Sequence, residues 1–433
     1  PSQKHLGELM FLLYKSGPSF TREKIDLAKQ TISKFLWERV VNQNILFAQQ
    51  LNIDAFDYSQ TIGWMSSWNS KCGIASYSKH LISNLDEEVI VFSPELENKL
   101  PKEKLQVIPC WKLDSKDNDN FDLILSNLTN LKITTLIIQF NYGFFNFSNF
   151  SNFIRKTLTL DINLVIFFHS TADPIHDQEK KLIYLLDVLR NVDRIFVHTI
   201  ADLNRLKNIG LVNNVTLFPH GILDYKINLP DYKKNNILER LKPRKIASYG
   251  FLLPHKGILQ LIEAINILRN QKFIVHLNLI NSIYSDDYLY FYDEVVQLIS
   301  TLKLSKLVTL QTDYLSDEDS LNLLSMNDLI VFPYQNTQES SSAAVRHGLA
   351  TGRPVLVTPL DIFEDVSNIV NFTSGISPKE IATCIRKWYE LNDFGSNMQD
   401  RNTRIKIIKE RSFSKLGQRL SSIIQGLYVN KAN

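Results

Sequence analysis

The sequence contains few cysteines and no long hydrophobic run. Its three cysteines, Cys72, Cys110 and Cys384, lie far apart in 433 residues and form no C-x-x-C pair. This spacing excludes a disulfide framework and favours a reducing compartment. No apolar run reaches the roughly 20 residues that a membrane helix needs, and the first residues lack the charged and then apolar order of a signal peptide. We therefore expect a cytoplasmic protein.

An excess of charge of either sign is also missing. Lys and Arg together number 48 and Asp and Glu 45, so the net charge is +3. That balance argues against a nucleic-acid partner, which would need a strongly basic surface. Hydrophobic residues make up 44% and charged residues 21%, as is typical of globular proteins. The length is enough for two or three domains.

Several common catalytic and metal-binding motifs are absent. The sequence has no G-x-S-x-G nucleophile elbow and no Walker loop. Its 9 histidines show no H-E-x-x-H spacing, so we expect no metal site.

Short apolar runs alternate with amphipathic stretches from Thr61 onward, in two sets. The first set predicts strands at 61–65, 88–93, 135–140, 163–168, 194–198 and 214–218, and helices at 73–85, 178–190 and 200–209. The second set predicts strands at 245–249, 273–280, 307–311, 328–333 and 354–358, and helices at 257–269, 287–303, 316–325, 342–351 and 378–391. Such alternation is typical of parallel α/β sheets. We expect two doubly wound, Rossmann-like domains that face each other across a cleft.

The domain boundaries follow the changes in this pattern. Residues 1–58 have apolar residues at helical spacing and predict a helical N-terminal extension. The two Rossmann-like domains span 59–225 and 244–410, and the polar, proline-containing segment 226–243 predicts a linker. Residues 411–433 predict a C-terminal helix that packs back toward the N-terminal domain.

Residues that follow strands are the candidates for a site, because open α/β sheets bind ligands beyond the carboxyl ends of their strands. In the segment WNSKCGIASYSKHL, Gly73 allows a tight turn, and the helix that follows presents free amides to an anion. An ordinary strand–helix turn is the alternative. Cys72 is expected to be a buried thiol rather than a nucleophile.

A histidine follows another strand of the first set. His169 comes directly after the apolar run LVIFF, where a titratable side chain would face a cleft. Ser170, Thr171 and Asp173 could orient its ring. A structural histidine is the alternative.

Two further segments follow strands in the second half. Lys256 lies next to Gly257 at a helix start, where an ammonium group suits a diphosphate; a solvated lysine is the alternative. Ser340–Ser342 precede a helix, so their hydroxyls and the first amides could hold an oxyanion as well as cap the helix. Glu339 precedes them, and its carboxylate suits sugar hydroxyls better than a phosphate.

In their order and spacing, these segments together resemble the family-4 retaining glycosyltransferases, which have the GT-B fold. The likeness extends over about residues 61–425 and includes DRIFVHTIADLNRLKNIGLVNNVTLFPHG at 193–221. It implies that Lys256 contacts the diphosphate of a nucleotide-sugar donor. It also implies that Glu339 faces the donor sugar and that His169 lies near the reacting centre. These three residues are the catalytic candidates.

The resemblance also implies which residues bind the donor and the acceptor. His347 stands where the family has a Glu that grips the nucleotide ribose, and Phe251 stands where it usually has an Arg. Arg244, Lys245 or Arg353 could supply the missing positive charge. The other donor-side candidates are Gly250, Ser340, Ser341, Ser342 and Ala343, and the acceptor-side candidates are Gly73, Trp68, Asn141 and Tyr142.

The implied function is a hexosyltransferase-like transfer of sugar from a nucleotide diphosphate to a glycan or lipid-linked saccharide. Configuration would be retained, no metal or other cofactor is expected, and the implied setting is bacterial O-antigen or capsule synthesis. The N-terminal extension could contact the inner face of the cytoplasmic membrane or a neighbouring domain of a longer chain. Phe251 and His347 leave open a degenerate GT-B protein that binds a glycan or partner without catalysis. A phosphorylase or epimerase on the same fold is a further alternative.

Overall fold

The computed structural model describes residues 3–34, 40–41, 60–95, 105–226, 243–337, 341–392 and 398–432. The chain divides into two compact units, Pro1–Ser59 and Gln60–Asn433. In the first unit, α1 (Gln3–Lys15) and α2 (Gly17–Lys34) meet at Gly17, whose φ of +76° favours glycine. The expected helical extension is confirmed over these two helices, and most of its remainder lies outside the described residues.

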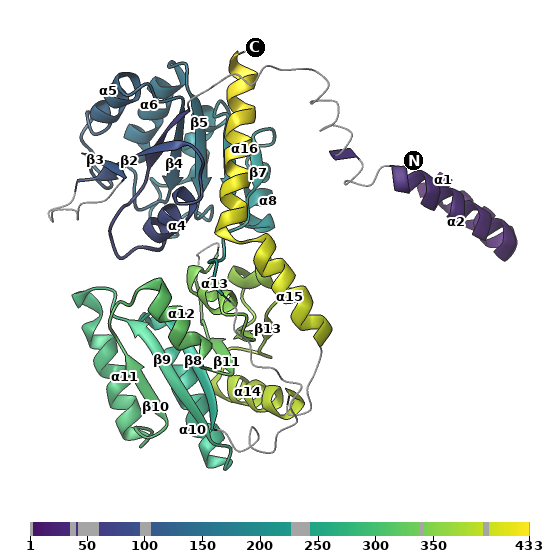
Figure 1. The fold of residues 1–433 in the computed structure, drawn as a ribbon, viewed down its shortest axis with the longest axis vertical. Coiled ribbons are helices and arrows are strands. Elements are labelled where there is room, and N and C mark those ends of the chain that lie inside the picture. Colours follow the sequence, from purple (N-terminus) through teal and green to yellow (C-terminus); the bar gives the residue numbers. More distant parts are fainter. Residues whose placement is uncertain are drawn as a thin grey trace. The chain divides into compact units, whose positions relative to one another are not determined.

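The described residues of the second unit form two parallel sheets (Figure 1). The first sheet has the order β3-β2-β1-β4-β5-β6-β7. Its strands are β1 (Thr61–Met65), β2 (Glu88–Pro94), β3 (Gln106–Trp111), β4 (Thr135–Phe140), β5 (Asn163–Phe168), β6 (Arg194–Val197) and β7 (Val215–Leu217). Its helices are α4 (Gly73–Ile82), α5 (Asp122–Asn130), α6 (Phe147–Leu158), the 3-10 turn η1 (Leu182–Leu185), α7 (Leu186–Leu189) and α8 (Ile200–Asn208).

The second sheet has the order β10-β9-β8-β11-β12-β13, again with parallel neighbours. Its strands are β8 (Arg244–Phe251), β9 (Val275–Ser282), β10 (Val308–Gln311), β11 (Leu329–Phe332), β12 (Val355–Val357) and β13 (Asn371–Phe372). Its helices and turns are η2 (Pro254–Lys256), α10 (Ile258–Asn270), η3 (Asp286–Tyr288), α11 (Leu289–Thr301), α12 (Asp317–Ser325), α13 (Ala343–Ala350), η4 (Asp361–Val366) and α14 (Pro378–Asn392). Two helices follow, α15 (Met398–Glu410) and α16 (Phe413–Ala432). The expected fold of two Rossmann-like α/β sheets is confirmed.

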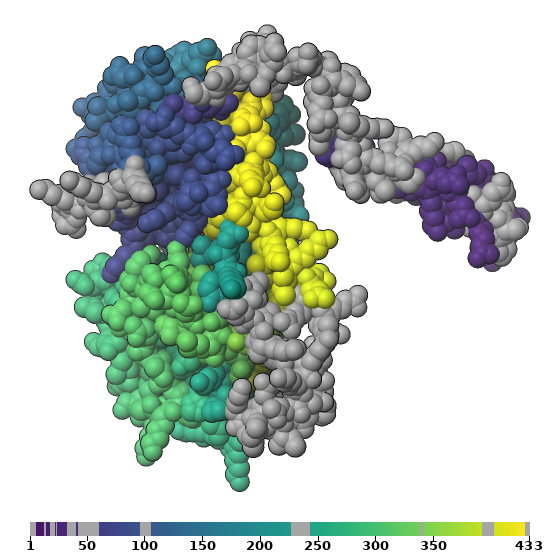
Figure 2. All heavy atoms as spheres, viewed as in Figure 1, coloured from purple at the N-terminus to yellow at the C-terminus, as the bar shows by residue number. Residues whose placement is uncertain are grey.

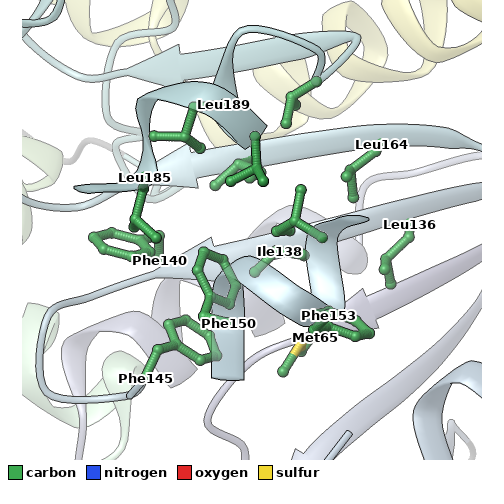
Figure 3. Close-up of a cluster of buried hydrophobic side chains, with 14 of the residues drawn as sticks. Met65, Leu136, Ile138, Phe140, Phe145, Phe150, Phe153, Leu164, Leu185 and Leu189 are labelled. Carbon is green, nitrogen blue, oxygen red and sulfur yellow. The ribbon is translucent and has the colours of Figure 1, made fainter. Parts of the chain in front are cut away.

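Aromatic side chains fill the core on one face of the first sheet. β4 and β5, with the sequences TLIIQF and NLVIFF, are buried at every residue, as is usual for central parallel strands. The ring centroids of Phe145 and Phe150 lie 4.4 Å apart, and those of Phe140 and Phe168 4.5 Å apart (Figure 3). This packing fixes the carboxyl ends of β4 and β5, from which candidate site residues project.

Helix α16 packs against the opposite face of the same sheet. Phe413, Leu416, Leu420 and Ile424 are buried in one cluster with side chains of β1 and α4, among them Trp64. Figure 2 shows α16, in yellow, along the blue surface of the residues that form this sheet. The last helix of the chain is therefore part of the core beneath the first sheet.

Close contacts at Ile222 and at Gly417 hold α16 against this face of the sheet. The Ile222 amide donates to the Arg411 carbonyl over 2.8 Å, and the Phe413 amide donates to the Ile222 carbonyl over 3.0 Å. Further along, a Cβ atom on Gly417 would lie 2.1 Å from the carbonyl oxygen of Asn84. Glycine is thus required where the helix backbone meets the chain that follows α4.

Every strand expected from the sequence is present, but β3, β13, α5, α6 and α15 were not expected. β3 contains Pro109, which lacks an amide donor, and it is tolerated because β3 lies at the sheet edge. α6 is rich in Phe, Asn and Ser, which have modest helix propensity. Its buried residues Phe147, Phe150 and Phe153 nevertheless recur at helical spacing.

The prediction of a helix over 178–190 was wrong in its extent, because helical structure covers only Leu182–Leu189. The residues before it are held by contacts with other loops. The Leu182 amide donates to Asp173 Oδ1 over 3.0 Å, and Lys180 Nζ donates to the Tyr142 carbonyl over 2.9 Å. These contacts hold residues 180–182 against neighbouring loops rather than in a continuing helix.

The predicted linker lies outside the described residues except at its ends, so the domain boundaries stay predictions. Within the described ranges, no helix is both long and apolar enough to cross a bilayer.

The contact at Gly417 can be tested with a second glycine of α16 as control. Gly417→Ala is expected to lower the free energy of unfolding by about 1–3 kcal/mol, because the added methyl group would overlap the Asn84 backbone. Gly426→Ala, which has nothing within 4 Å of the added atom, is expected to raise it by about 0.5–1 kcal/mol. Urea unfolding measures both, and equal effects would contradict the close packing of α16.

Candidate functional site

A cavity of about 510 Å³ lies where carboxyl ends of strands from both sheets meet. Asn141 and His169 directly follow β4 and β5, and Phe251 ends β8. Both the size and the place are typical of small-molecule sites in α/β proteins. The cavity brings together these predicted residues: Gly73, Asn141, His169, Gly250, Lys256, Ser341, Ser342, Ala343 and His347. Glu339 and Ser340 lie outside the described residues.

Two predicted acceptor-side residues do not line the cavity. Trp68 is buried in the cluster that α16 joins, because its large apolar ring packs against the core. Tyr142 is also buried, and its hydroxyl donates to Asp173 Oδ1 over 2.9 Å. Cys72, expected to be buried, instead is partly exposed and lines the cavity.

Lys256 enters the cavity wall from the turn between β8 and α10. Its side chain is not the solvated lysine of the alternative interpretation, since the residue is only 8% exposed. The ammonium nitrogen lies 4.1 Å from the centre of the Tyr334 ring, a cation–π contact. The neighbouring Gly257 has a φ of +72°, and a Cβ atom there would lie 1.8 Å from the Pro333 carbonyl oxygen. Glycine therefore lets this turn pack directly on the end of β11.

The N-terminus of α13 forms another part of the wall. Ser342 caps the helix, because its hydroxyl accepts from the Val345 amide over 3.3 Å and hydrogen-bonds the Tyr334 hydroxyl over 2.9 Å. Ala343 and Ala344 line the cavity at the first helical turn, where amides have no partner within the helix. The positive end of the helix dipole and Lys256 thus act on the same space.

Glycines allow close approach around this helix start. Gly250 has a φ of +126°, and a Cβ atom on it would lie 3.2 Å from the Cβ atom of Ala344. A Cβ atom on Gly73, at the start of α4, would lie 4.0 Å from the Cβ atom of Ala343. Elements of both sheets therefore meet at the N-terminus of α13.

His169 belongs to a buried chain of hydrogen bonds whose proton positions can be assigned. His198 Nδ1 lies 2.9 Å from the Phe218 carbonyl oxygen, which can only accept, so this nitrogen has the proton. His198 Nε2 must then accept from His169 Nδ1, at 3.3 Å. His169 Nε2 is left as an acceptor and lies 2.7 Å from the Gln139 side-chain oxygen. The amide nitrogen of Gln139 has no partner as placed, so the amide is assigned the flipped orientation, in which its N–H donates to His169 Nε2.

Burial keeps the histidines of this region neutral. It lowers the pKa of His169 well below its ordinary value, and the nearby His198 adds to the effect. It also lowers the pKa of His198 and, well below the ordinary value, that of His220. All three rings surround the ring of Tyr77, with centroids at 5.1, 5.3 and 4.9 Å. Gln139 and His198, rather than the expected Ser170, Thr171 and Asp173, orient His169.

His347 is held by a carboxylate that the sequence analysis missed. His347 Nε2 lies 2.9 Å from Asp317 Oδ1, and His80 Nε2, from α4, lies 3.1 Å from Asp317 Oδ2. The hydrogen bond with His347, together with the close contact of His80, holds the pKa of the Asp317 carboxyl well below its usual range. In the sequence, Asp317 follows Ser316, the cap of α12, and an acidic first turn is common at helix starts. Asp317 therefore looked like an ordinary helix-start residue in the sequence, although it lines the cavity.

Aromatic rings occupy the wall where the resemblance led us to look for an arginine. Phe251 is stacked on Tyr314 at 6.1 Å and meets Tyr284 edge-on at 5.0 Å, and all three line the cavity. The basic residues suggested as substitutes, Arg244, Lys245 and Arg353, do not line it. They precede or begin β8 and β12, so they lie at the opposite ends of those strands.

Within the described ranges, no group of three or more His, Cys, Asp and Glu side chains is arranged to hold a metal ion. The expectation of a metal-free reaction stays a prediction.

Comparison with known proteins gives a clear result for the fold. The sequence matches no family model and no curated protein. A glycosyltransferase from Rickettsia africae superposes with a TM-score of 0.68 at 16% identity, over 85% of this chain and 98% of that one. Sucrose-phosphate synthase from Thermosynechococcus elongatus gives 0.65 at 12% identity, over 86% and 100%. HepE from Anabaena, solved with UDP and glucose, gives 0.64 at 13% identity, over 85% and 100%.

The chain has the GT-B fold. The two parallel sheets match this architecture along nearly the whole length of the structures compared. At these low identities the likeness extends to the fold, and the chemistry has to be argued from the cavity itself.

The buried neutral histidines predict an acid-sensitive fold. Below a pH of about 6.5, the unfolded chain binds protons that His169, His198 and His220 do not bind when folded. The free energy of unfolding should therefore decrease as the pH is lowered, by up to roughly 1 kcal/mol per pH unit for each histidine. Urea unfolding between about pH 7.5 and pH 5 measures this slope.

A pair of variants assigns the slope to the cluster. His198→Gln should make it shallower, whereas His176→Gln, at an exposed position, should leave it as in the unaltered protein. An unaltered slope in His198→Gln would show that these histidines are not its source.

Proposed function

We propose that the protein is a glycosyltransferase that moves a sugar from a nucleoside diphosphate donor to a saccharide acceptor. One observation supports this above the others. The buried Lys256 and the N-terminus of α13 line one cavity at the carboxyl ends of two parallel sheets. Together they offer a diphosphate a full positive charge and amide donors.

The same groups suit the chemistry of transfer. As the bond between the sugar and the diphosphate breaks, negative charge grows on the leaving phosphate oxygen. Lys256 and the amides of Ala343 and Ala344 are held in place before the reaction, so they stabilise that charge more than the ground state. Glu339, by the family-4 resemblance, would face the donor sugar.

His169 is proposed to position the donor sugar rather than to move a proton. Its Nδ1 proton is directed at His198, and its Nε2 is held by Gln139. Burial lowers its pKa well below the ordinary value, which keeps the ring neutral at neutral pH. Because both ring nitrogens are hydrogen-bonded within the protein, the neutral, fixed imidazole would orient the sugar by packing against it. Attack from the same face as the leaving group would account for the proposed retention of configuration.

The acceptor is proposed to enter beside Gly73 and Asn141, which line the cavity next to the first sheet. HepE has been solved with UDP and glucose, and a trehalose-phosphate synthase from Burkholderia xenovorans with glucose-6-phosphate. These structures support a sugar acceptor for a cavity of this kind. A lipid-linked glycan, a family-4 assignment, metal independence and a role in surface polysaccharide synthesis at the cytoplasmic membrane rest on the sequence resemblance.

A second candidate is a GT-B protein that binds a nucleotide or glycan without catalysis. The aromatic wall of Phe251, Tyr284 and Tyr314 favours it, because stacked rings bind sugar or base faces but neutralise no phosphate charge. The two candidates differ in whether a sugar nucleotide is consumed when a saccharide acceptor is present.

Nucleotide binding tests the proposal through the thermal stability of the protein. One of the diphosphates UDP, GDP and dTDP should raise the unfolding temperature, since a ligand at about 100 times its Kd adds about 2.7 kcal/mol to stability. Lys256→Ala should abolish the shift, and Lys306→Ala, an exposed lysine elsewhere in the second sheet's helices and loops, should keep it. No shift with any nucleotide would refute the proposal. Binding without consumption of a sugar nucleotide would favour the second candidate.

A further inference from the structure

Asp317 presents a carboxylate to the cavity wall and is held there from two sides. Its side chain is 45% exposed, and Asp317 lines the cavity together with His347. Oδ1 faces His347 of α13, and Oδ2 faces His80 of α4. A carboxylate fixed by two imidazoles in this way has a defined orientation, which a free surface Asp lacks.

The Asp317 carboxylate keeps its negative charge. The hydrogen bond with His347 Nε2, 2.9 Å from Oδ1, holds the pKa of the carboxyl well below its usual range. His347 is itself fixed on α13, where its Nδ1 lies 3.2 Å from the Ala343 carbonyl oxygen.

The carboxylate retains capacity for a ligand. Two oxygens offer about four acceptor positions, of which the hydrogen bond with His347 uses one. His80 Nε2 lies 3.1 Å from Oδ2 without hydrogen-bond alignment. The exposed part of the side chain leaves room for further donors on the cavity side. Another anion would be repelled there, so a ligand group beside Asp317 has to be a donor, such as a hydroxyl.

The distance between Asp317 and the proposed diphosphate site suits the two hydroxyls of a nucleotide ribose. His347 lies four residues after Ala343 on α13, which is about 6 Å along the helix axis. Asp317 is therefore about one helical turn from the amides that would hold the diphosphate. In a nucleotide, the ribose diol lies at a comparable remove from the phosphates. Tyr314, three residues before Asp317, lines the same wall and offers a ring face to a base.

We infer that Asp317 accepts hydrogen bonds from the vicinal 2′- and 3′-hydroxyls of the nucleotide ribose, and so selects ribonucleotides over deoxyribonucleotides. His347 and His80 act as positioning residues that hold the carboxylate toward the cavity. This inference rests on the proposed function, since it concerns the same nucleotide.

Calorimetric titration with ribose and deoxyribose forms of one nucleotide tests the inference. The probes are UDP and dUDP, with GDP and dGDP as the second pair. For the base that binds, the unaltered protein should prefer the ribose form by about tenfold or more. Asp317→Ala and Asp317→Asn should weaken the ribose form until the preference is within about twofold. Both variants should weaken the deoxyribose form less than the ribose form, because the deoxyribose form offers Asp317 only its 3′-hydroxyl.

A neighbouring acidic residue provides the matched control. Glu318→Gln removes one negative charge from the same helix at an exposed position that does not line the cavity, and it should keep the preference. If Asp317→Ala keeps the preference, the inference fails while the proposed function stands. If Asp317→Ala weakens the binding of the ribose and deoxyribose forms equally, Asp317 has only a structural role and the inference fails as well. If the unaltered protein binds none of the four nucleotides, the inference fails, and the thermal-shift panel decides the proposed function separately.

Discussion

The contact between Gly257 and the Pro333 carbonyl fixes where positive charge enters the cavity. No residue with a Cβ atom fits there, since that atom would lie 1.8 Å from the oxygen. The preceding Lys256 is thereby placed over the Tyr334 ring, and Tyr334 in turn hydrogen-bonds Ser342, the cap of α13. These contacts together fix the position of Lys256 relative to the N-terminus of α13. The proposed diphosphate site depends on this relative position more than on the number of positively charged side chains.

The first sheet contributes orientation rather than charge. The Phe218 carbonyl fixes the tautomer of His198, which fixes that of His169, so the imidazole beside the cavity is held at both nitrogens. The cost is a buried group of neutral histidines that an acidic solution disfavours. α16 packs on the same face of the sheet as Tyr77, around which these rings gather. A helix from the end of the chain therefore supports the geometry of the site.

Much of this was accessible from the sequence, and the failures have physical causes. Buried strands such as LVIFF are continuous apolar runs, and His169 and Lys256 follow strands, so both were found. Arg244 was wrongly considered for the cavity, because it begins β8 and the cavity lies at the other end of that strand. Trp68 follows a strand but packs into the core. Asp317 was missed because its acidic helix start has an ordinary capping explanation, and its partners come from two distant helices.

The most direct test of the proposed diphosphate site is a crystal structure of the protein with its nucleoside diphosphate bound. Diphosphate oxygens are expected within hydrogen-bonding distance of Lys256 Nζ and of the amides of Ala343 and Ala344, at the N-terminus of α13. A diphosphate bound elsewhere, with Lys256 still packed on Tyr334 and away from it, would contradict the central claim.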